Sequence, residues 1–143
     1  MPYTYLEDIA IADIAFEARA DTREALFVEA GDALMNVMVE DLSAIRPAVR
    51  RGFRVEAGDL ERLLFDFLQL FIFFKDAEQL LLRVSAVAIA EERQGLVLTA
   101  EAAGEKIDPH RHELNADVKA VTFHRFRVGH EAGVWKATVV LDI

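Results

Sequence analysis

Hydrophobic side chains are most concentrated between Asp59 and Lys75, where the sequence reads DLERLLFDFLQLFIFFK. The first half of this segment spaces its polar residues as an amphipathic helix does, whereas the second half is apolar nearly all round. Such a helix must be buried on most of its sides, and a sheet curved around it could bury most of its apolar side chains. We therefore expect this helix to lie at the centre of the hydrophobic core.

The segment before this helix predicts a strand and a second helix. Polar and apolar residues alternate from Ile11 to Ala20, which is the period of a strand with one buried face. Asp21 and Glu24 have the spacing of a capping box, with Asp21 as the cap. The helix that they open is predicted to run to roughly Val39, with an ordinary apolar stripe that packs on a sheet.

Three arginines, Arg50, Arg51 and Arg54, lie on a strand predicted from Val49 to Glu56. They could form a docking patch for an acidic or RNA-bearing partner, or they could be a solvated strand face. We favour the solvated face, because runs of charge are usually solvated. Gly58 and Asp59 then form the turn and cap that begin the central helix.

The second half of the chain predicts two hairpins separated by a polar loop. The expected strands are 80–91 and 96–103 in the first hairpin, and 118–128 and 134–143 in the second, with the loop at 104–115. A short apolar segment at residues 3–6 is expected to start or edge a sheet. The predicted fold is a single α+β domain over residues 1–143, with two helices packed on a mixed, mostly antiparallel sheet of about six strands.

The composition excludes several kinds of binding site and partner. The 143 residues include 16 basic and 25 acidic side chains, for a net charge of −9, and no cysteine. Disulfides and thiolate metal sites are therefore excluded, and so acidic a chain is expected not to bind nucleic acid directly. Neither a secretion signal nor a membrane-spanning run is evident, so we expect a soluble, cytoplasmic protein with no membrane partner.

The carboxylates are the most informative candidate chemistry. Asp13 opens the first long strand, Asp76 follows the central helix, and Asp142 is the second-last residue, beside the α-carboxylate of Ile143. Grouped acids repel one another unless a cation compensates them, and oxygen-only ligation suits a hard divalent ion. From the residues alone, three unrelated surface aspartates remain the simpler interpretation.

The histidines give weaker signals. His110 and His112 have the spacing of a zinc pair, but Pro109 places them in a turn and no third ligand is near in sequence. His124 lies in a predicted strand, where a structural histidine is the default interpretation. A stand-alone hydrolase built on these histidines would need a nucleophile or metal within reach, and the sequence indicates no such pairing.

Two C-terminal segments resemble the archease family: GEKIDPHRHELNADVKAVTFH from Gly104 to His124, and GVWKATVVLDI from Gly133 to Ile143. The N-terminal strand and helix and the segment DLERLLFDFLQLFIFFKD also resemble family elements, so the likeness covers essentially the whole chain in order. The most specific parts are His112-Glu113-Leu114, the segment from Asp117 to Thr122, and the terminal pair Asp142-Ile143.

The resemblance implies an accessory protein of the RtcB-type RNA ligase, which promotes ligase guanylylation and multiple turnover in tRNA splicing and RNA repair and carries out no reaction alone. It also implies a carboxylate-bound divalent metal, Ca²⁺ above all and otherwise Mg²⁺ or Mn²⁺. The implied ligands are Asp13, Asp142 and the carboxylate of Ile143, with Asp76 as a further acidic position. A chaperone-like modulator of a tRNA-modifying methyltransferase is the alternative that the family suggests.

Three residues are expected to contact the partner: Lys119, His112 and Glu113. One departure from the family pattern lies beside the expected metal ligands. The family often has His-Thr before its Ala-Asp pair, whereas this chain has Ala10-Ile11 before Ala12-Asp13. Two polar groups are therefore missing next to the expected metal site, so they are dispensable or the site is weaker than in other members.

Overall fold

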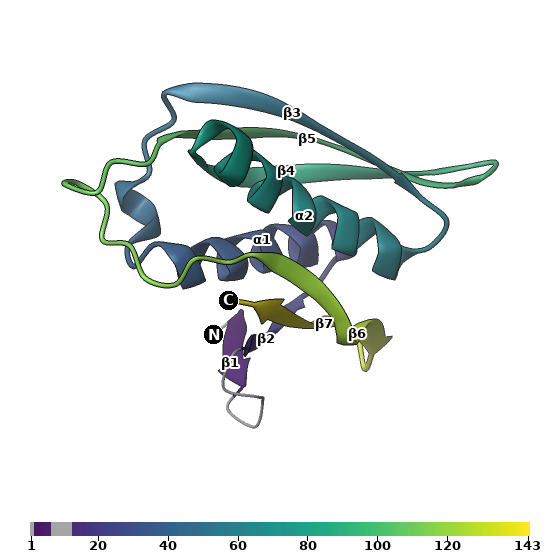
Figure 1. Ribbon diagram of the computed structural model, residues 1–143. Coiled ribbons are helices and arrows are strands. Elements are labelled where there is room, and N and C mark those ends of the chain that lie inside the picture. Colours follow the sequence, from purple (N-terminus) through teal and green to yellow (C-terminus); the bar gives the residue numbers. More distant parts are fainter. Residues whose placement is uncertain (1, 7–12) are drawn as a thin grey trace.

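The computed structural model describes residues 2–6 and 13–143. This part of the chain forms seven strands, two α-helices and one short 3₁₀ helix (Figure 1). In chain order they are β1 (Tyr3–Leu6), β2 (Asp13–Ala20), α1 (Arg23–Met38), η1 (Leu42–Ala44), β3 (Val49–Ala57), α2 (Leu60–Glu78), β4 (Leu80–Glu92), β5 (Gly95–Lys106), β6 (Ala120–Glu131) and β7 (Val134–Asp142). The α+β class and both helices were predicted correctly.

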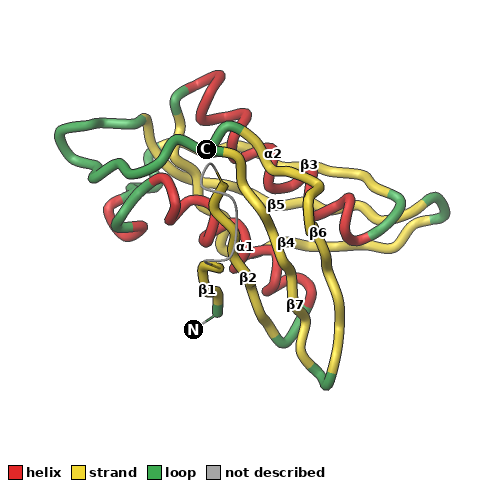
Figure 2. The backbone as a smooth tube through the Cα atoms, turned by 60° about the horizontal axis from the view of Figure 1, so that its bottom comes forward, coloured by secondary structure: helices red, strands yellow, loops and turns green. Residues whose placement is uncertain are grey.

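The strands form two sheets, and in this respect the predicted single mixed sheet was wrong. One sheet has the order β1-β2-β7-β6 and the other has the order β3-β5-β4, and every neighbouring pair is antiparallel. The helices lie between the two sheets in a three-layer arrangement (Figures 1 and 2). Alternation along a strand shows that one face is buried, but it does not show which other strands share that sheet.

Helix α2 is the centre of the core, as its composition predicted. Phe67 is fully buried and touches the rings of Phe27, Phe53 and Phe71, with centroids 5.1–5.8 Å apart. Helix α1 crosses at the same level, where Gly31 leaves room for the Phe71 ring. The sheets do not cover α2 on all sides, because Phe73 remains 58% exposed. The expectation that this end of the helix would be buried was wrong at that residue.

The helix caps are local features that sequence reading placed almost correctly. Asp59 caps α2, and its carboxylate accepts a hydrogen bond from the Arg62 amide at 2.8 Å. The N-cap of α1 is Thr22 and not Asp21, because the Thr22 hydroxyl accepts from the Ala25 amide at 3.0 Å. Either residue type can cap a helix, so the one-residue difference has no sequence signal.

Three side chains of α2, spaced four residues apart, hold strand β6 against the helix. The Gln69 side chain accepts a hydrogen bond from the Val121 amide at 3.3 Å, and Glu61 accepts one from the Val128 amide at 2.9 Å. Between them, Phe65 packs against the part of β6 that lies between these two amides. Polar residues of α2 therefore occupy amides along the outer edge of β6 that would otherwise be open to another chain.

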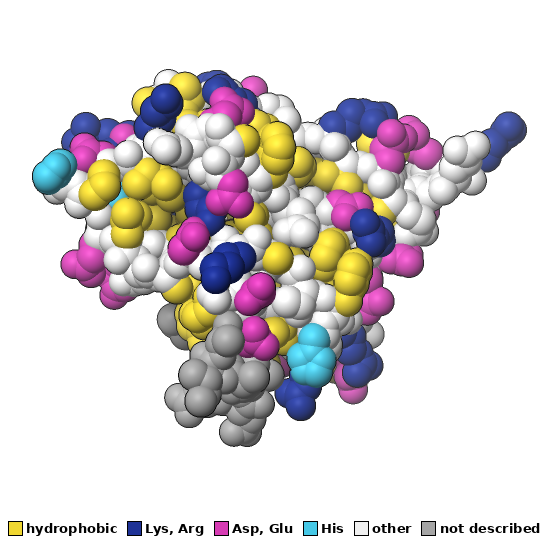
Figure 3. Space-filling model, viewed as in Figure 1, with side chains coloured by type: hydrophobic (Ala, Val, Ile, Leu, Met, Phe, Trp, Pro, Cys, Tyr) yellow, Lys and Arg dark blue, Asp and Glu magenta, His cyan; other side chains and the backbone are white. Residues whose placement is uncertain are grey.

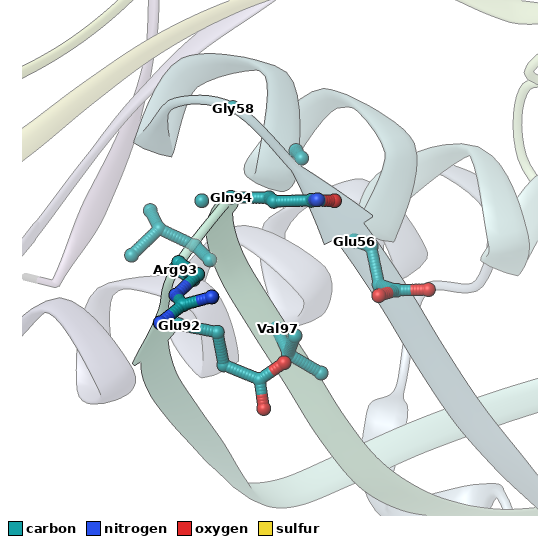
Figure 4. A pocket seen from close by; sticks show the side chains of 9 residues that line it. Glu56, Gly58, Glu92, Arg93, Gln94 and Val97 are labelled. Atoms are coloured by element: carbon teal, nitrogen blue, oxygen red, sulfur yellow. The ribbon is translucent and has the colours of Figure 1, made fainter.

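The hairpin formed by β4 and β5 projects beyond the rest of the molecule (Figure 1). At its tip, Gly95 has φ 144° and a Cβ there would lie 2.5 Å from the Ala57 carbonyl oxygen. A hollow of about 430 Å³ lies beside this turn, and the charged side chains of Glu56, Glu92 and Arg93 line it without converging on one point (Figure 4). In the described residues, no helix has the length and apolar character that a bilayer crossing requires.

Candidate functional site

The pairing of β2 with β7 brings together two of the carboxylates that sequence analysis selected. In the register of this pair, Asp13 lies directly opposite Asp142. Paired residues of neighbouring strands project from the same face of a sheet, so the two carboxylates are neighbours. The next pair, Ile14 and Leu141, faces the core, which leaves both aspartates partly exposed at the end of their strands.

The end of the chain is held at the same corner of the sheet. The side chain of Ile143 is partly buried and packs against the core. On the other side of β7, the Lys119 amide donates a hydrogen bond to the Asp142 carbonyl oxygen at 2.8 Å. Lys119, one of the expected partner contacts, is exposed, and this hydrogen bond holds its backbone beside the end of β7.

Asp76 has a different neighbourhood. Its carboxylate pairs with the ammonium of Lys75 at 3.0 Å, and the same ammonium pairs with Asp117 and donates to the Val118 carbonyl oxygen at 2.7 Å. Lys75 is only 7% exposed, and a buried ammonium needs such partners. Asp76 therefore compensates the charge of the buried Lys75 ammonium, whereas Asp13 and Asp142 face each other.

A hollow of about 390 Å³ adjoins the carboxylate pair. Asp13 is one of its lining residues, and Tyr5, Leu6, Ile14 and Val37 supply much of its apolar lining. Tyr5 and Leu6 are 42% and 37% exposed, so this lining is open to solvent. The Ala10-Ile11 departure from the family pattern falls outside the described residues.

His112, expected to contact a partner, is a structural residue of the polar loop. It is 2% exposed, its Nδ1 accepts a hydrogen bond from the Asp108 amide at 2.9 Å, and its Nε2 lies 3.0 Å from the carboxylate of Glu105. A ring this buried offers no contact surface in the free protein, so the contact role of His112 stays a prediction. Glu113 is exposed, and its carbonyl oxygen accepts from the Glu40 amide at 2.9 Å.

Glu105 is the centre of that loop. Burial opposes the ionisation of its carboxyl group, but hydrogen bonds from the Arg46 amide, from Arg111 and from His112 outweigh burial and lower its pKa to about 2. Sequence reading missed this cluster: Glu105, Arg111 and His112 lie in the polar loop, but no motif in the loop shows that they contact one another, and Arg46 comes from a separate segment. Its function is to hold the loop in place, together with hydrogen bonds from the loop to the end of α1.

The remaining candidates do not assemble into a site. Each arginine of β3 is paired with an acid: Arg50 with Glu101, Arg51 with Glu78, and Arg54 with Glu56. These pairs agree with the solvated-face interpretation. Within residues 2–6 and 13–143, no group of three or more histidine, aspartate or glutamate side chains is close enough to hold a metal ion. A cation at the Asp13–Asp142 pair would therefore need main-chain or water oxygens as further ligands.

The chain was compared with protein families and with solved structures. Residues 3–143 match the model of the Archease protein family (MTH1598/TM1083). The chain is 37% identical to protein archease from Methanopyrus kandleri over the full length of both, and 36% identical to that of Pyrococcus abyssi over 92% of this chain and 93% of the relative.

Two solved structures have the same fold. The solution structure of protein 1598 from Methanobacterium thermoautotrophicum superposes with a TM-score of 0.86 at 35% identity, covering 99% of each chain. The crystal structure of an archease from Thermotoga maritima, described as a possible chaperone, gives a TM-score of 0.65 at 21% identity, covering 96% of this chain and 97% of that one. The family model and the relatives together show that this chain belongs to the archease family.

Proposed function

We propose that this protein is an accessory protein of an RtcB-type RNA ligase, which it activates by promoting ligase guanylylation and turnover. The observation that carries the proposal is the register that places Asp13 opposite Asp142 at an exposed corner of the sheet. Family membership supports the accessory role.

The donor set at this corner fits a hard divalent cation. Asp13 and Asp142 supply carboxylate oxygens, and the backbone carboxylate of Ile143 is proposed as the third anionic ligand. Oxygen ligands of this kind suit Ca²⁺, which accepts flexible coordination, better than they suit Zn²⁺. Asp76 is a weaker candidate ligand, because Lys75 already compensates its charge.

The mechanism that we propose is one of positioning. When bound, the cation would supply positive charge for anionic groups at the ligase's nucleotide site. Asp13 and Asp142 would hold that charge at the surface, and the apolar hollow beside Asp13 would let the ligase dock next to it. Chemistry would remain with the ligase, and this chain would contribute orientation and electrostatic preorganisation.

A ligase guanylylation assay tests this proposal. We expect Asp13→Asn and Asp142→Asn to lose most of the stimulation that the wild-type protein gives. Asp21→Asn is the matched control, because Asp21 is an exposed aspartate just beyond the opposite end of β2. Equal stimulation by all four proteins would remove the carboxylate pair from the mechanism.

A second candidate function is a chaperone-like modulator of a tRNA-modifying methyltransferase. Its support is the set of large apolar side chains that remain exposed: Tyr5, Leu6, Phe73, Leu114 and Phe123. Light scattering of an aggregating methyltransferase separates this function from the first. Suppression of aggregation that survives Asp142→Asn but weakens in Phe73→Ser would favour it.

A further inference from the structure

The outer edge of β3 lacks the protection that α2 gives to the outer edge of β6. Strand β3 ends the order β3-β5-β4, so it pairs with β5 on one side only. In Figure 1 it forms the upper outline of the molecule, and no strand or helix runs along its far side. Within the described residues, the main chain of β3 makes one hydrogen bond to a side chain, from the Arg51 guanidinium to the Arg50 carbonyl oxygen at 2.7 Å. That oxygen has a second lone pair, so the edge is open to a further strand.

The sequence of β3 is complementary in charge to itself. When two copies of β3 pair antiparallel over all nine residues, the pairing is centred on Phe53. In this register Arg50 lies opposite Glu56 of the partner subunit, twice by symmetry. Arg54 lies opposite Gly52 of the partner subunit, which has no side chain to hinder it. A shift by two residues brings Arg50 opposite Arg54 in one direction and Arg54 opposite its own copy in the other, and like charges at such positions are unfavourable.

The charges along this edge cancel, although the whole chain carries −9. Each of the three arginines of β3 is paired with a glutamate, so the edge adds no net repulsion between two copies. Figure 3 shows basic and acidic side chains next to one another along the upper rim of the molecule, where β3 runs in Figure 1. The side chains of Arg50, Arg54 and Glu56 are more than half exposed, and ion pairs so exposed contribute little. They can therefore exchange their present partners for those of a second copy.

Beside the free edge of β3, helix α2 leaves a large apolar side chain uncovered. Phe74 stacks on Phe53 with centroids 5.7 Å apart and planes 8° apart, and Phe73, which is 58% exposed, meets Phe74 edge-on at 5.2 Å. Phe71 points toward α1, where it faces Gly31. Two residues along a helix correspond to a turn of about 200°, so Phe73 points away from α1. Because α1 is hydrogen-bonded to β4, at the other end of the sheet, Phe73 lies on the side of the free edge.

The register that matches the charges also brings this apolar surface together. A two-fold axis that passes through Phe53, normal to the sheet, keeps both α2 helices on the same face of the joined sheet. Phe73 is next to the ring that stacks on Phe53, so the Phe73 side chains of the two copies approach each other near the axis. Leu70 and Ala77 lie on the same face of α2, three residues before and four residues after Phe73. The charge pattern of β3 and the apolar face of α2 therefore indicate one and the same arrangement.

We propose that the free edge of β3 pairs antiparallel with β3 of a second copy of this chain, in the register centred on Phe53, and forms a two-fold symmetric dimer. Main-chain hydrogen bonds join the two sheets into one, as in other cases of strand addition to an open edge. The reciprocal pairs of Arg50 with Glu56 select the register, and the exposed face of α2 supplies apolar surface to bury. This inference does not depend on the proposed role toward the ligase.

Sedimentation velocity of the full chain over a wide range of concentrations tests this inference, and the wild type should show a monomer–dimer equilibrium. Glu56→Arg should weaken dimerisation by about tenfold or more, because it places arginines opposite each other at two positions while making the whole chain less negative. The double variant Arg50→Glu/Glu56→Arg has the net charge of the wild type and should restore the dimer. Arg54→Gln is the matched control on the same edge, because Arg54 faces glycine in this register, and it should dimerise as the wild type does.

Introduced cysteines measure the register directly, because the chain has none of its own. A Cβ atom at Gly52 would meet nothing within 4 Å, so a cysteine fits there. A mixture of Gly52→Cys and Arg54→Cys proteins should form a disulfide-linked heterodimer on mild oxidation, because directly opposed positions have Cβ atoms about 4.5–5.5 Å apart. Each protein alone should cross-link more slowly, since its two cysteines are then diagonal neighbours.

Circular dichroism establishes that each variant is folded before its association is measured. The inference is overturned if the wild type stays monomeric up to millimolar concentration, or if Glu56→Arg dimerises as the wild type does. It is also overturned if the folded double variant stays monomeric, or if the cysteine mixture cross-links no faster than either protein alone. A monomeric wild type whose stimulation of the ligase falls with Glu56→Arg but not with Arg54→Gln would assign this edge to the ligase instead.

Discussion

The carboxylate pair makes a prediction that needs no partner protein. Asp13 and Asp142 face each other across β2 and β7, so without a cation their charges repel. Replacing Asp142 by asparagine removes the repulsion and also removes a proposed ligand. The variant should therefore be more stable than the wild type in a chelator and less stable than the wild type in saturating Ca²⁺.

The magnitudes follow from the register. Directly opposed side chains on one sheet face have Cβ atoms ~4.5–5.5 Å apart, and like charges there cost about 0.2–1 kcal/mol. Both aspartates are partly exposed, so solvent screens part of the repulsion and we expect Asp142→Asn to gain about 0.2–1 kcal/mol in the chelator. We expect Ca²⁺ at ~100 times its Kd to add about 2.7 kcal/mol to the stability of the wild type, because the proposed site exists in the folded state alone. For a domain of this size that corresponds to a rise of roughly 8–10 °C in Tm.

Thermal unfolding followed by circular dichroism, in chelator and in a Ca²⁺ titration, measures both effects. Asp21→Asn serves again as the control, and it should keep the full rise in Tm with Ca²⁺. Mg²⁺ should give a smaller rise, because it requires stricter octahedral geometry. A wild-type Tm that does not respond to millimolar Ca²⁺, or an Asp142→Asn variant that responds equally, would refute the reasoning.

Three further predictions concern stability. Gly104→Ala should destabilise the fold by about 3 kcal/mol or more, because a Cβ there would lie 1.8 Å from the Leu81 carbonyl oxygen and a strand backbone cannot yield as a side chain can; a urea midpoint equal to that of the wild type would contradict this. Phe67→Ala should cost about 3–5 kcal/mol through loss of the buried aromatic cluster, measured by the same denaturation. The folded-state pKa of Glu105 lies near 2, below its ordinary value, so its contribution is present above about pH 4.5 and is lost as pH falls toward 2. Glu105→Gln should lower stability by up to about 3 kcal/mol near neutral pH and flatten the acid limb of the stability curve, and an unchanged acid limb would exclude Glu105 as its source.

His112 and Lys75 show that the burial of a polar side chain could not be predicted from the sequence. His112 and Lys75 are polar residues that would ordinarily lie at the surface, yet both are nearly fully buried. Asp117, a partner of Lys75, comes from a distant segment, and Glu105, although in the same loop as His112, meets it only once the loop is folded. A residue that is specific to a family can therefore be a structural residue, and only its burial distinguishes it from a contact residue.

Strand β6 shows the same limit of sequence reading. The three-residue bulge in β6 and the stack of Phe123 on Phe65 arise from pairing with β7 and from contact with α2. No periodicity in the segment from Phe123 to Arg127 indicates that the Phe123 ring stays 61% exposed.

By itself the sequence determined the local elements: the positions of both helices, the Asp59 cap, the two hairpins and the polar loop. These follow from side-chain periodicity and capping, which act over a few residues. Tertiary structure alone decided that the strands divide into two sheets around the helices, that β2 pairs with β7, and that Asp13 therefore meets Asp142. The reason is physical: register between strands more than a hundred residues apart depends on how all the buried faces pack together, and no single segment contains that information.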